Sequence, residues 1–152
     1  MIQFDFDQIP NDATSNQMRA MQSICNVVKT SHPILIFGCN GDIRRGIAHQ
    51  IANQSMYRSS EVTYFDCGIE YGNVPLIAGT IIIDNIDYAS EFVQDRLQDY
   101  MHEQRIRRGR KSHMRFIFLC ETNLVKRVEA GYLLPGVFYN MVLSINADHV
   151  LM

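Results

Sequence analysis

Apolar positions follow two patterns along this chain: short continuous runs, and stripes with helical spacing. Continuous apolar runs are typical of strands that are buried on both faces of a sheet. They occupy residues 34–37, 62–65, 80–83 and 116–120, and a fifth strand is expected over 141–145. A stripe at three- and four-residue steps lies between the first two runs, at Ile47, Ala48, Ile51 and Ala52. This spacing predicts a helix from about Ile43, packed against the sheet.

Four more helices are predicted in the remaining segments. Capping side chains at residues 14–16 precede a stripe that predicts a helix ending near Lys29. Its apolar positions are Met18, Met21, Cys25 and Val28. Residues 89–104 are expected to form a further helix, with a stripe made of Phe92, Val93, Leu97 and Met101. Shorter helices are expected near Asn123 and over 134–139.

Strands that alternate with helices indicate an α/β fold with a mainly parallel five-stranded sheet covered on both sides. No internal repeat or linker interrupts the pattern. We therefore predict an irregular lead-in over residues 1–13 and a single domain over 14–152. The 152-residue length is enough for one substantial core.

Composition narrows the choice of function and compartment. A net charge of −2 gives no general attraction to nucleic acid or membranes. No apolar stretch reaches the roughly 18 residues of a membrane span, and the acidic N-terminus is unlike a signal peptide. The four cysteines and five histidines show no metal-ligand spacing. We expect a cytoplasmic protein with no metal site and with cysteines that act as small buried hydrophobes.

The stretch ILIFGCNGDIRRG, residues 34–46, has the context of a phosphate-binding loop, with a strand before a glycine turn and a helix after it. Such a loop reads G-x-x-x-x-G-K-[ST], and its Lys reaches phosphate while its hydroxyl holds Mg²⁺. In the frame that begins at Gly38, Ile43 replaces the second Gly, Arg44 replaces the Lys and Arg45 stands near the hydroxyl. Phosphate binding and a plain tight turn both remain open for Gly38 and Gly41.

The stretch GTIIIDNI, residues 79–86, matches the strand that carries the metal-binding Asp of P-loop enzymes, here Asp84. A capping role at the end of the strand is the simpler alternative for Asp84. Such ATPases usually follow this Asp with a Glu that polarises water. Asn85 holds that place, and an amide cannot act as a general base.

Nearly the whole chain, from about Thr14 to Ile145, resembles the central AAA+ domain of NtrC-type sigma-54 activators. The matching segments are FGCNGDIRRGIAHQIA, VTYFDCG, AGTIIIDNIDYASEFVQDRLQDYM, RFIFLCETN and VFYNMVLSI, in the family's order. The resemblance implies a three-layer αβα P-loop NTPase-like fold that lacks the helical lid subdomain. It also places Asn123 at the A-T-N asparagine, which helps to position the attacking water in the family.

The departures from the family fall on its chemistry. Besides Arg44 and Asn85, Leu134 and Asn140 stand where the family has two arginines that reach the neighbouring subunit's γ-phosphate. The G-A-F-T-G-A loop that contacts sigma-54 is absent, so no sigma-54 contact is expected. These losses predict that the domain is not an enzyme. An atypical ATPase whose missing groups come from elsewhere is the alternative.

Nucleotide binding without hydrolysis stays open, with ATP, ADP or another nucleotide as the ligand and no certain cofactor. The residues that would bind it are Gly38, Asn40, Gly41, Arg44, Arg45, Asp84 and Asn123.

A basic segment holds six of the 14 Lys and Arg residues between positions 105 and 115. These residues are Arg105, Arg107, Arg108, Arg110, Lys111 and Arg115. A solvated turn explains them, while contact with DNA, RNA or an acidic partner is the functional alternative.

The sequence thus predicts a non-catalytic AAA+-like regulatory domain that works through a protein partner or self-association. A nucleic-acid-binding module built on the basic segment is a further alternative. The chain is expected to be either a fragment of a longer transcriptional regulator or a stand-alone protein.

Overall fold

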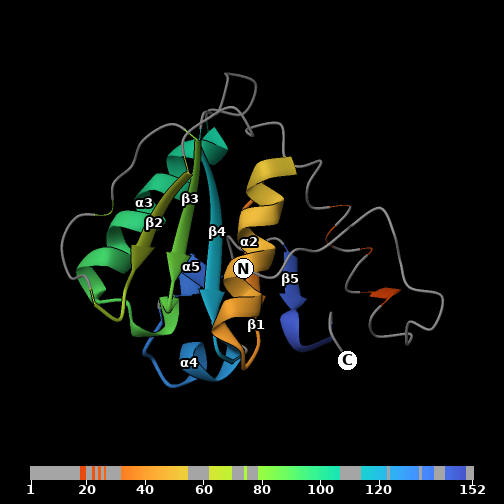
Figure 1. Cartoon of the computed structure of the whole chain (residues 1–152). Coiled ribbons are helices and arrows are strands. Elements are labelled where there is room, and N and C mark those ends of the chain that lie inside the picture. Colours follow the sequence, from red (N-terminus) through yellow and green to blue (C-terminus); the bar gives the residue numbers. More distant parts are fainter. Residues whose placement is uncertain are drawn as a thin grey trace.

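A parallel sheet of five strands forms the centre of the computed structural model (Figure 1). Its strands are β1 (Ile34–Phe37), β2 (Val62–Asp66), β3 (Gly79–Asp84), β4 (Met114–Cys120) and β5 (Leu143–Asn146). Their order is β2-β3-β4-β1-β5, and all four pairings are parallel. The predicted five-stranded sheet is confirmed. The structure describes residues 18, 19, 22, 24, 26, 32–54, 62–69, 74, 79–106, 114–122, 124–133, 135–138 and 143–149.

Helices connect the strands. They are α2 (Gly41–Gln54), α3 (Glu91–Ile106), α4 (Val125–Glu129) and α5 (Pro135–Phe138), with 3-10 turns η1 (Ile86–Tyr88) and η2 (Ala147–His149). The described positions 18, 19, 22, 24 and 26 are also helical, as the sequence predicts for this region. Of the described helices, none is long and apolar enough to cross a membrane.

The core is divided between the two faces of the sheet because neighbouring strand residues point to opposite sides. One cluster joins Ile34 and Ile36 of β1 to the apolar stripe of α2 and to Ile24. The other cluster joins Leu35 to α3 and α5. Helices therefore cover both faces, which confirms the three-layer αβα architecture.

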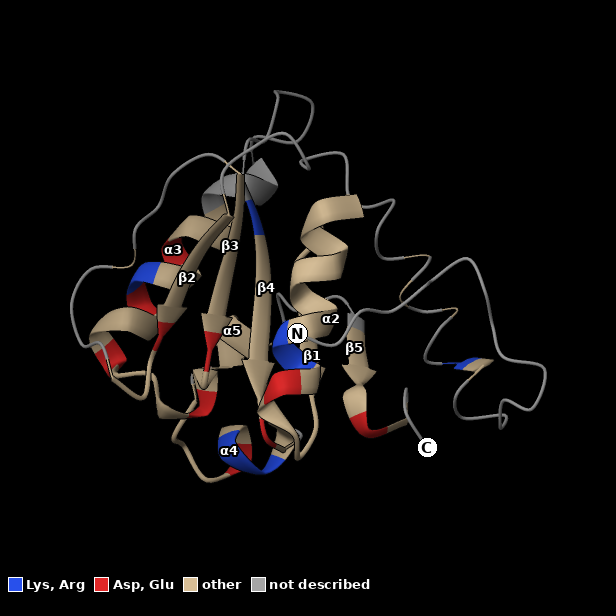
Figure 2. Ribbon diagram, viewed as in Figure 1, with Lys and Arg blue, Asp and Glu red and all other residues tan. Residues whose placement is uncertain are grey.

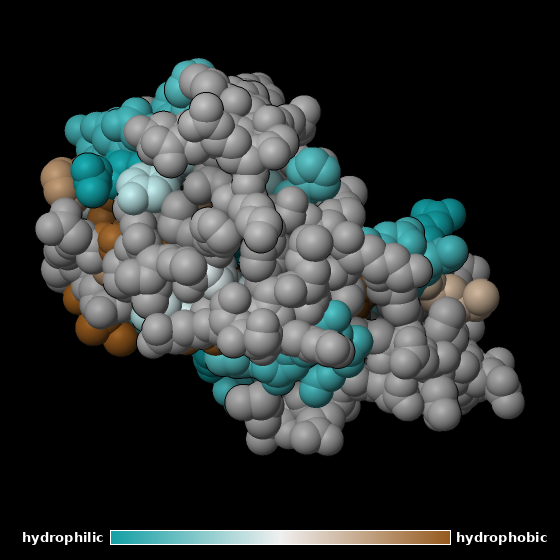
Figure 3. Space-filling view, turned by 90° about the horizontal axis from the view of Figure 1, so that it is seen from above, coloured by the Kyte–Doolittle hydropathy of each residue, from teal (hydrophilic) through white to brown (hydrophobic). Residues whose placement is uncertain are grey.

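Two expected core residues are exposed instead. Phe92 lies in the first turn of α3 and is 53% exposed, whereas Val93 beside it is buried. Successive helical residues are rotated by about 100°, so a stripe through Val93 turns Phe92 outward. Met18 is 49% exposed, and the buried residue described in that region is Ile24. In the view of Figure 3, hydrophobic surface gathers on the side that carries α3 and β2 in Figure 1.

Candidate functional site

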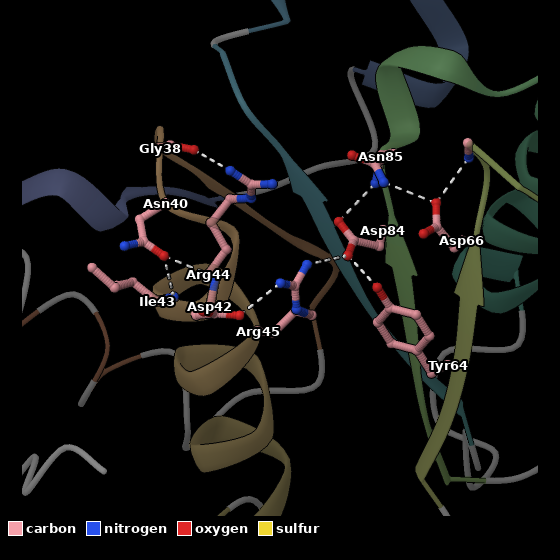
Figure 4. Close-up of polar contacts among 11 residues, drawn as sticks. Gly38, Asn40, Asp42, Ile43, Arg44, Arg45, Tyr64, Asp66, Asp84 and Asn85 are labelled. Carbon is pink, nitrogen blue, oxygen red and sulfur yellow. Dashed lines mark hydrogen bonds and ion pairs between the residues drawn. The ribbon is translucent and has the colours of Figure 1, made fainter. Parts of the chain in front are cut away.

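The carboxyl ends of β1, β2 and β3 lie at the same edge of the sheet as the first turn of α2 (Figure 4). In doubly wound sheets ligands bind outside this edge. Charged residues also occur on the ribbon at this edge (Figure 2). Arg44 and Arg45 come from α2, whereas Asp66 and Asp84 end two paired strands. The structure thus brings together the sequence-predicted residues from Gly38 to Arg45 and Asp84.

Helix α2 begins at Gly41, so Asp42 and Ile43 are helical rather than part of an extended loop. Asn40 caps this helix. Its Oδ1 accepts hydrogen bonds from the backbone N–H groups of Asp42 at 2.9 Å and Ile43 at 3.3 Å. The first N–H groups of a helix are the ones that bind a phosphate in P-loop proteins. In this chain a neutral side chain of the turn itself already satisfies two of them.

Arg44 stands in the frame where the family has its phosphate-binding Lys, but its side chain points back into the protein. Its Nη1 donates to the carbonyl oxygen of Gly38, and the residue is only 6% exposed. Its Nε is buried and has no hydrogen-bond partner among the described residues. The guanidinium therefore braces the turn between β1 and α2 instead of reaching out to a ligand.

The turn is also held by η2, near the end of the chain. The backbone N–H of Cys39 donates to Asp148 Oδ1 at 2.9 Å. A Cβ on Gly38 would lie 2.9 Å from the same oxygen and 3.1 Å from the backbone nitrogen of Asp148, so a glycine is needed for this approach. The Asp148 carboxylate is the main reason why the pKa of the Cys39 thiol is raised.

Asp84 is fully buried and receives hydrogen bonds from three groups. Asn85 donates its backbone N–H to Oδ1 at 2.8 Å. Arg45 Nη1 lies 3.3 Å from Oδ2, and the Tyr64 hydroxyl donates to the same oxygen. Burial, followed by the hydrogen bond to Asp84, raises the pKa of Tyr64. Arg45 also pairs with Asp42 at 2.9 Å, and this hydrogen bond is the largest cause of its raised pKa.

Asn85, at the position of the family's catalytic Glu, has a left-handed backbone with φ 52°. Its Nδ2 donates to Asp66 Oδ1 at 2.8 Å, and the same oxygen accepts the N–H of Gly68 at 2.8 Å. The side chain is therefore engaged with the end of β2. Asp66, Tyr64 and Asp148 are site residues that the sequence interpretation missed.

Asp87 precedes α3 and is of a residue type favoured at helix N-caps, but it does not cap this helix. Ser90 performs this role, since its Oγ accepts the N–H of Val93 at 3.2 Å. The Asp87 Oδ1 atom is buried and has no hydrogen-bond partner among the described residues. Its burial raises the pKa of the Asp87 carboxyl.

Other predicted residues fall elsewhere. Asn123, Arg107, Arg108, Arg110 and Lys111 lie outside the described residues, as does the side chain of Arg105. Arg115 is fully buried in β4, opposite Thr80 of β3, so it does not belong to a solvent-facing basic surface. Within the described ranges, no group of three or more His, Cys, Asp or Glu side chains is arranged to hold a metal ion.

The strand order, the turn after β1 and the acid that ends β3 define an α/β domain with the P-loop NTPase fold. NtrX from Brucella abortus in complex with ADP is similar over 95% of this chain and 38% of its own, at 15% identity and a TM-score of 0.73. The P-loop NTPase domain of the sigma-54 transport activator from E. coli is similar over 86% of this chain and 92% of its own, at 16% identity and a TM-score of 0.65. RuvB from Thermotoga maritima is similar over 86% of this chain and 44% of its own, at 14% identity and a TM-score of 0.62.

The fold is therefore that of the AAA+ central domain of sigma-54 activators, as the sequence resemblance implies. The chain spans less than two fifths of the length of the NtrX chain bound to ADP. No protein-family model matches the sequence, and no curated protein matches it significantly.

Proposed function

We propose that this domain is a non-catalytic relative of the sigma-54 activator ATPase domains, which acts as a regulatory or assembly module through protein contacts. One observation carries the proposal: Asn40 Oδ1 already accepts hydrogen bonds from two of the helix N–H groups that a phosphate would bind. An anion could bind these groups only after the cap is broken, and such a cap is worth about 1 kcal/mol.

The residues around the turn support the same conclusion. Arg44, at the place of the phosphate-binding Lys, donates to the Gly38 carbonyl from a buried position. Asn85, at the place of the general base, is an amide that binds Asp66. ATP hydrolysis needs charge stabilisation at the γ-phosphate and a group that positions water. Among the described residues, neither role has a free side chain at the place where the family has it.

Nucleotide titration tests this proposal directly. NtrX was solved in complexes with ADP and with ATP, so the fold itself accommodates a nucleotide. For this chain, isothermal titration with ATP, ADP and cyclic dinucleotides is expected to show no heat of binding at millimolar ligand. A phosphate-release assay is expected to show no turnover above background. Turnover that disappears in Asp84→Ala would overturn the proposal, because it would show a working site at the end of β3.

A surface cluster, Tyr88, Arg127 and Tyr132, favours a role in protein contacts. The guanidinium of Arg127 lies 5.6 Å from the ring centroids of both tyrosines, which are 60% and 67% exposed. Tyr and Arg are enriched in protein interfaces, where they provide much of the binding energy. A carboxylate of a partner is the group that would pair best with the guanidinium of Arg127.

A second copy of the chain offers such carboxylates. Exposed acidic residues recur at four-residue steps along α3, at Glu91, Asp95 and Asp99. We therefore expect self-association, measured as concentration-dependent sedimentation that weakens as salt screens the charges. Arg127→Ala should weaken it, and Lys126→Ala, which removes an exposed neighbouring charge without the aromatic contacts, should have less effect. A monomer at every concentration, or equal effects of the two variants, would contradict this role for the cluster.

A further inference from the structure

A positive charge already stands at the place where a working P-loop enzyme holds its metal ion. In such enzymes Mg²⁺ is held by the Ser or Thr after the loop Lys and by the Asp that ends a second strand of the sheet. In this chain Arg45 stands near the position of that hydroxyl, and Asp84 is the strand-end acid. Their side chains contact each other directly, with Arg45 Nη1 3.3 Å from Asp84 Oδ2 (Figure 4).

The residues at this junction do not fit magnesium. Mg²⁺ demands near-octahedral oxygen ligands at about 2.0–2.1 Å. Both carboxylate oxygens of Asp84 are engaged, Oδ1 with the Asn85 N–H and Oδ2 with Arg45 and Tyr64. Asp84 is fully buried, and the guanidinium would repel a second cation at this distance.

The position of the guanidinium is supported on several sides. Asp42 pairs with Arg45 Nη2 at 2.9 Å from the first turn of the same helix. Gly41 leaves room for it, because a Cβ there would lie 3.0–3.3 Å from three guanidinium atoms. The Arg45 side chain is 39% exposed while its partner Asp84 is fully buried, so the charge reaches from the helix surface to a buried carboxylate.

We propose that Arg45 is a built-in replacement for the Mg²⁺ ion of the P-loop fold. It neutralises the buried Asp84 and links the first turn of α2 to the end of β3, the two elements that hold the metal in working P-loop enzymes. The inference rests on the proposed non-catalytic function and deepens it. With its own cation, the domain keeps the first turn of α2 linked to the end of β3 whether or not ATP and magnesium are present.

Replacement of the arginine by the residue type of the family tests the inference. Arg45→Thr removes the guanidinium that repels a metal ion and supplies the hydroxyl, so a metal at Asp84 competes only with the hydrogen bonds from Asn85 and Tyr64. The midpoint of thermal unfolding of this variant should fall by roughly 5–10 °C without metal. Millimolar MgCl₂ should recover a substantial part of that loss, relative to NaCl of equal ionic strength. The midpoint of the wild-type protein should not respond to magnesium.

Two control variants separate metal binding from a general loss of packing. Arg45→Lys keeps a cation near Asp84, so it should respond to magnesium as little as the wild type does. The double variant Arg45→Thr with Asp84→Asn lacks the carboxylate, so it should stay at the low midpoint in magnesium. Binding of Mn²⁺, followed by electron paramagnetic resonance, should appear in Arg45→Thr alone.

Specific outcomes would overturn the inference. Magnesium-dependent stabilisation of the wild type would do so, as would an Arg45→Thr variant that binds no Mn²⁺ and gains no stability from Mg²⁺. If Arg45→Thr is unfolded without metal, recovery of its circular dichroism on addition of Mg²⁺ supports the inference, and lack of recovery contradicts it. ATP turnover by the wild type would contradict the proposed function instead, so the two failures are distinguishable.

Discussion

The side-chain amide of Asn85 donates a hydrogen bond of 2.8 Å to Asp66 Oδ1, and this contact joins the end of β3 to the end of β2. Asn85 makes it from a left-handed backbone with φ 52° and ψ 46°, a conformation that Asn adopts more readily than most residues. At the position of the family's catalytic Glu, Asn85 thus adopts the left-handed backbone readily and donates its amide to the neighbouring carboxylate of Asp66.

Asn85→Glu should therefore destabilise the domain instead of creating an ATPase. Glu loses the amide donor, adds a negative charge near Asp66 and Asp84, and tolerates the left-handed conformation poorly. Together these effects should cost about 2–4 kcal/mol in free energy of unfolding. Chemical denaturation measures the loss, and a phosphate-release assay should remain at background.

Asn85→Gly is the matched control for the backbone. Glycine adopts the left-handed conformation freely but lacks the amide, so this variant should lose less stability than Asn85→Glu. If Asn85→Glu matched the wild type in stability, the hydrogen bond to Asp66 would have no structural role.

Removal of the helix cap at Asn40 gives a second prediction. Asn40→Ala leaves the N–H groups of Asp42 and Ile43 without their acceptor, and it should cost about 1 kcal/mol in free energy of unfolding. The freed N–H groups favour anions, so sulfate should stabilise this variant more than it stabilises the wild type. Thermal unfolding in sulfate and in chloride of equal ionic strength measures the difference.

Glycine is a good N-cap residue, so Asn40→Gly should lose only a few tenths of a kcal/mol. An Asn40→Ala variant with wild-type stability and no added response to sulfate would show that the Asn40 side chain does not keep anions from the helix N–H groups.

The pattern of apolar residues was enough to predict the elements whose burial requires a continuous apolar run or a helical spacing of apolar positions. The expected strand over 34–37 has the bounds of β1, and all four residues of the stripe that begins at Ile47 are buried in α2. The resemblance also led correctly to the fold. These features depend on local residue order, which the sequence displays directly.

Contacts between segments that are far apart in the sequence could not be predicted, because no local residue pattern marks them. Asp148 binds Cys39 across 109 positions, and nothing in the residues around Asp148 marks it as part of the site. Arg115 looked like a member of a basic surface because charged side chains are usually exposed, yet it is fully buried in β4. The early start of α2 was within reach of sequence reasoning, since Asn40 is a favoured N-cap residue.

The close approach of η2 to the turn predicts a large effect for a small change at Gly38. In Gly38→Ala the added Cβ would lie 2.9 Å from Asp148 Oδ1 and 3.1 Å from its backbone nitrogen, so the backbone of η2 must move. Overpacking of this kind should cost about 1–3 kcal/mol in free energy of unfolding. Equilibrium denaturation measures the change.

Gly131→Ala is a useful comparison because nothing lies within 4 Å of the added atom, although its φ of +80° is unfavourable for alanine. Gly131→Ala should therefore lose only about 1 kcal/mol in free energy of unfolding, because of the unfavourable backbone conformation alone. Equal stability of Gly38→Ala and the wild type would mean that η2 does not pack against the turn.

The last prediction concerns the reactivity of Cys39, whose thiol is exposed. The Asp148 carboxylate is the largest cause of its raised pKa, and Glu121 contributes less. The thiolate is the reactive form of cysteine, so Asp148→Asn should lower the pKa of Cys39 and speed its alkylation at neutral pH. Glu121→Gln should produce a smaller increase. Alkylation rates, followed by mass spectrometry of the peptide that contains Cys39, should show a pH profile shifted to lower pH in Asp148→Asn, and an unchanged profile would place the carboxylate away from the thiol.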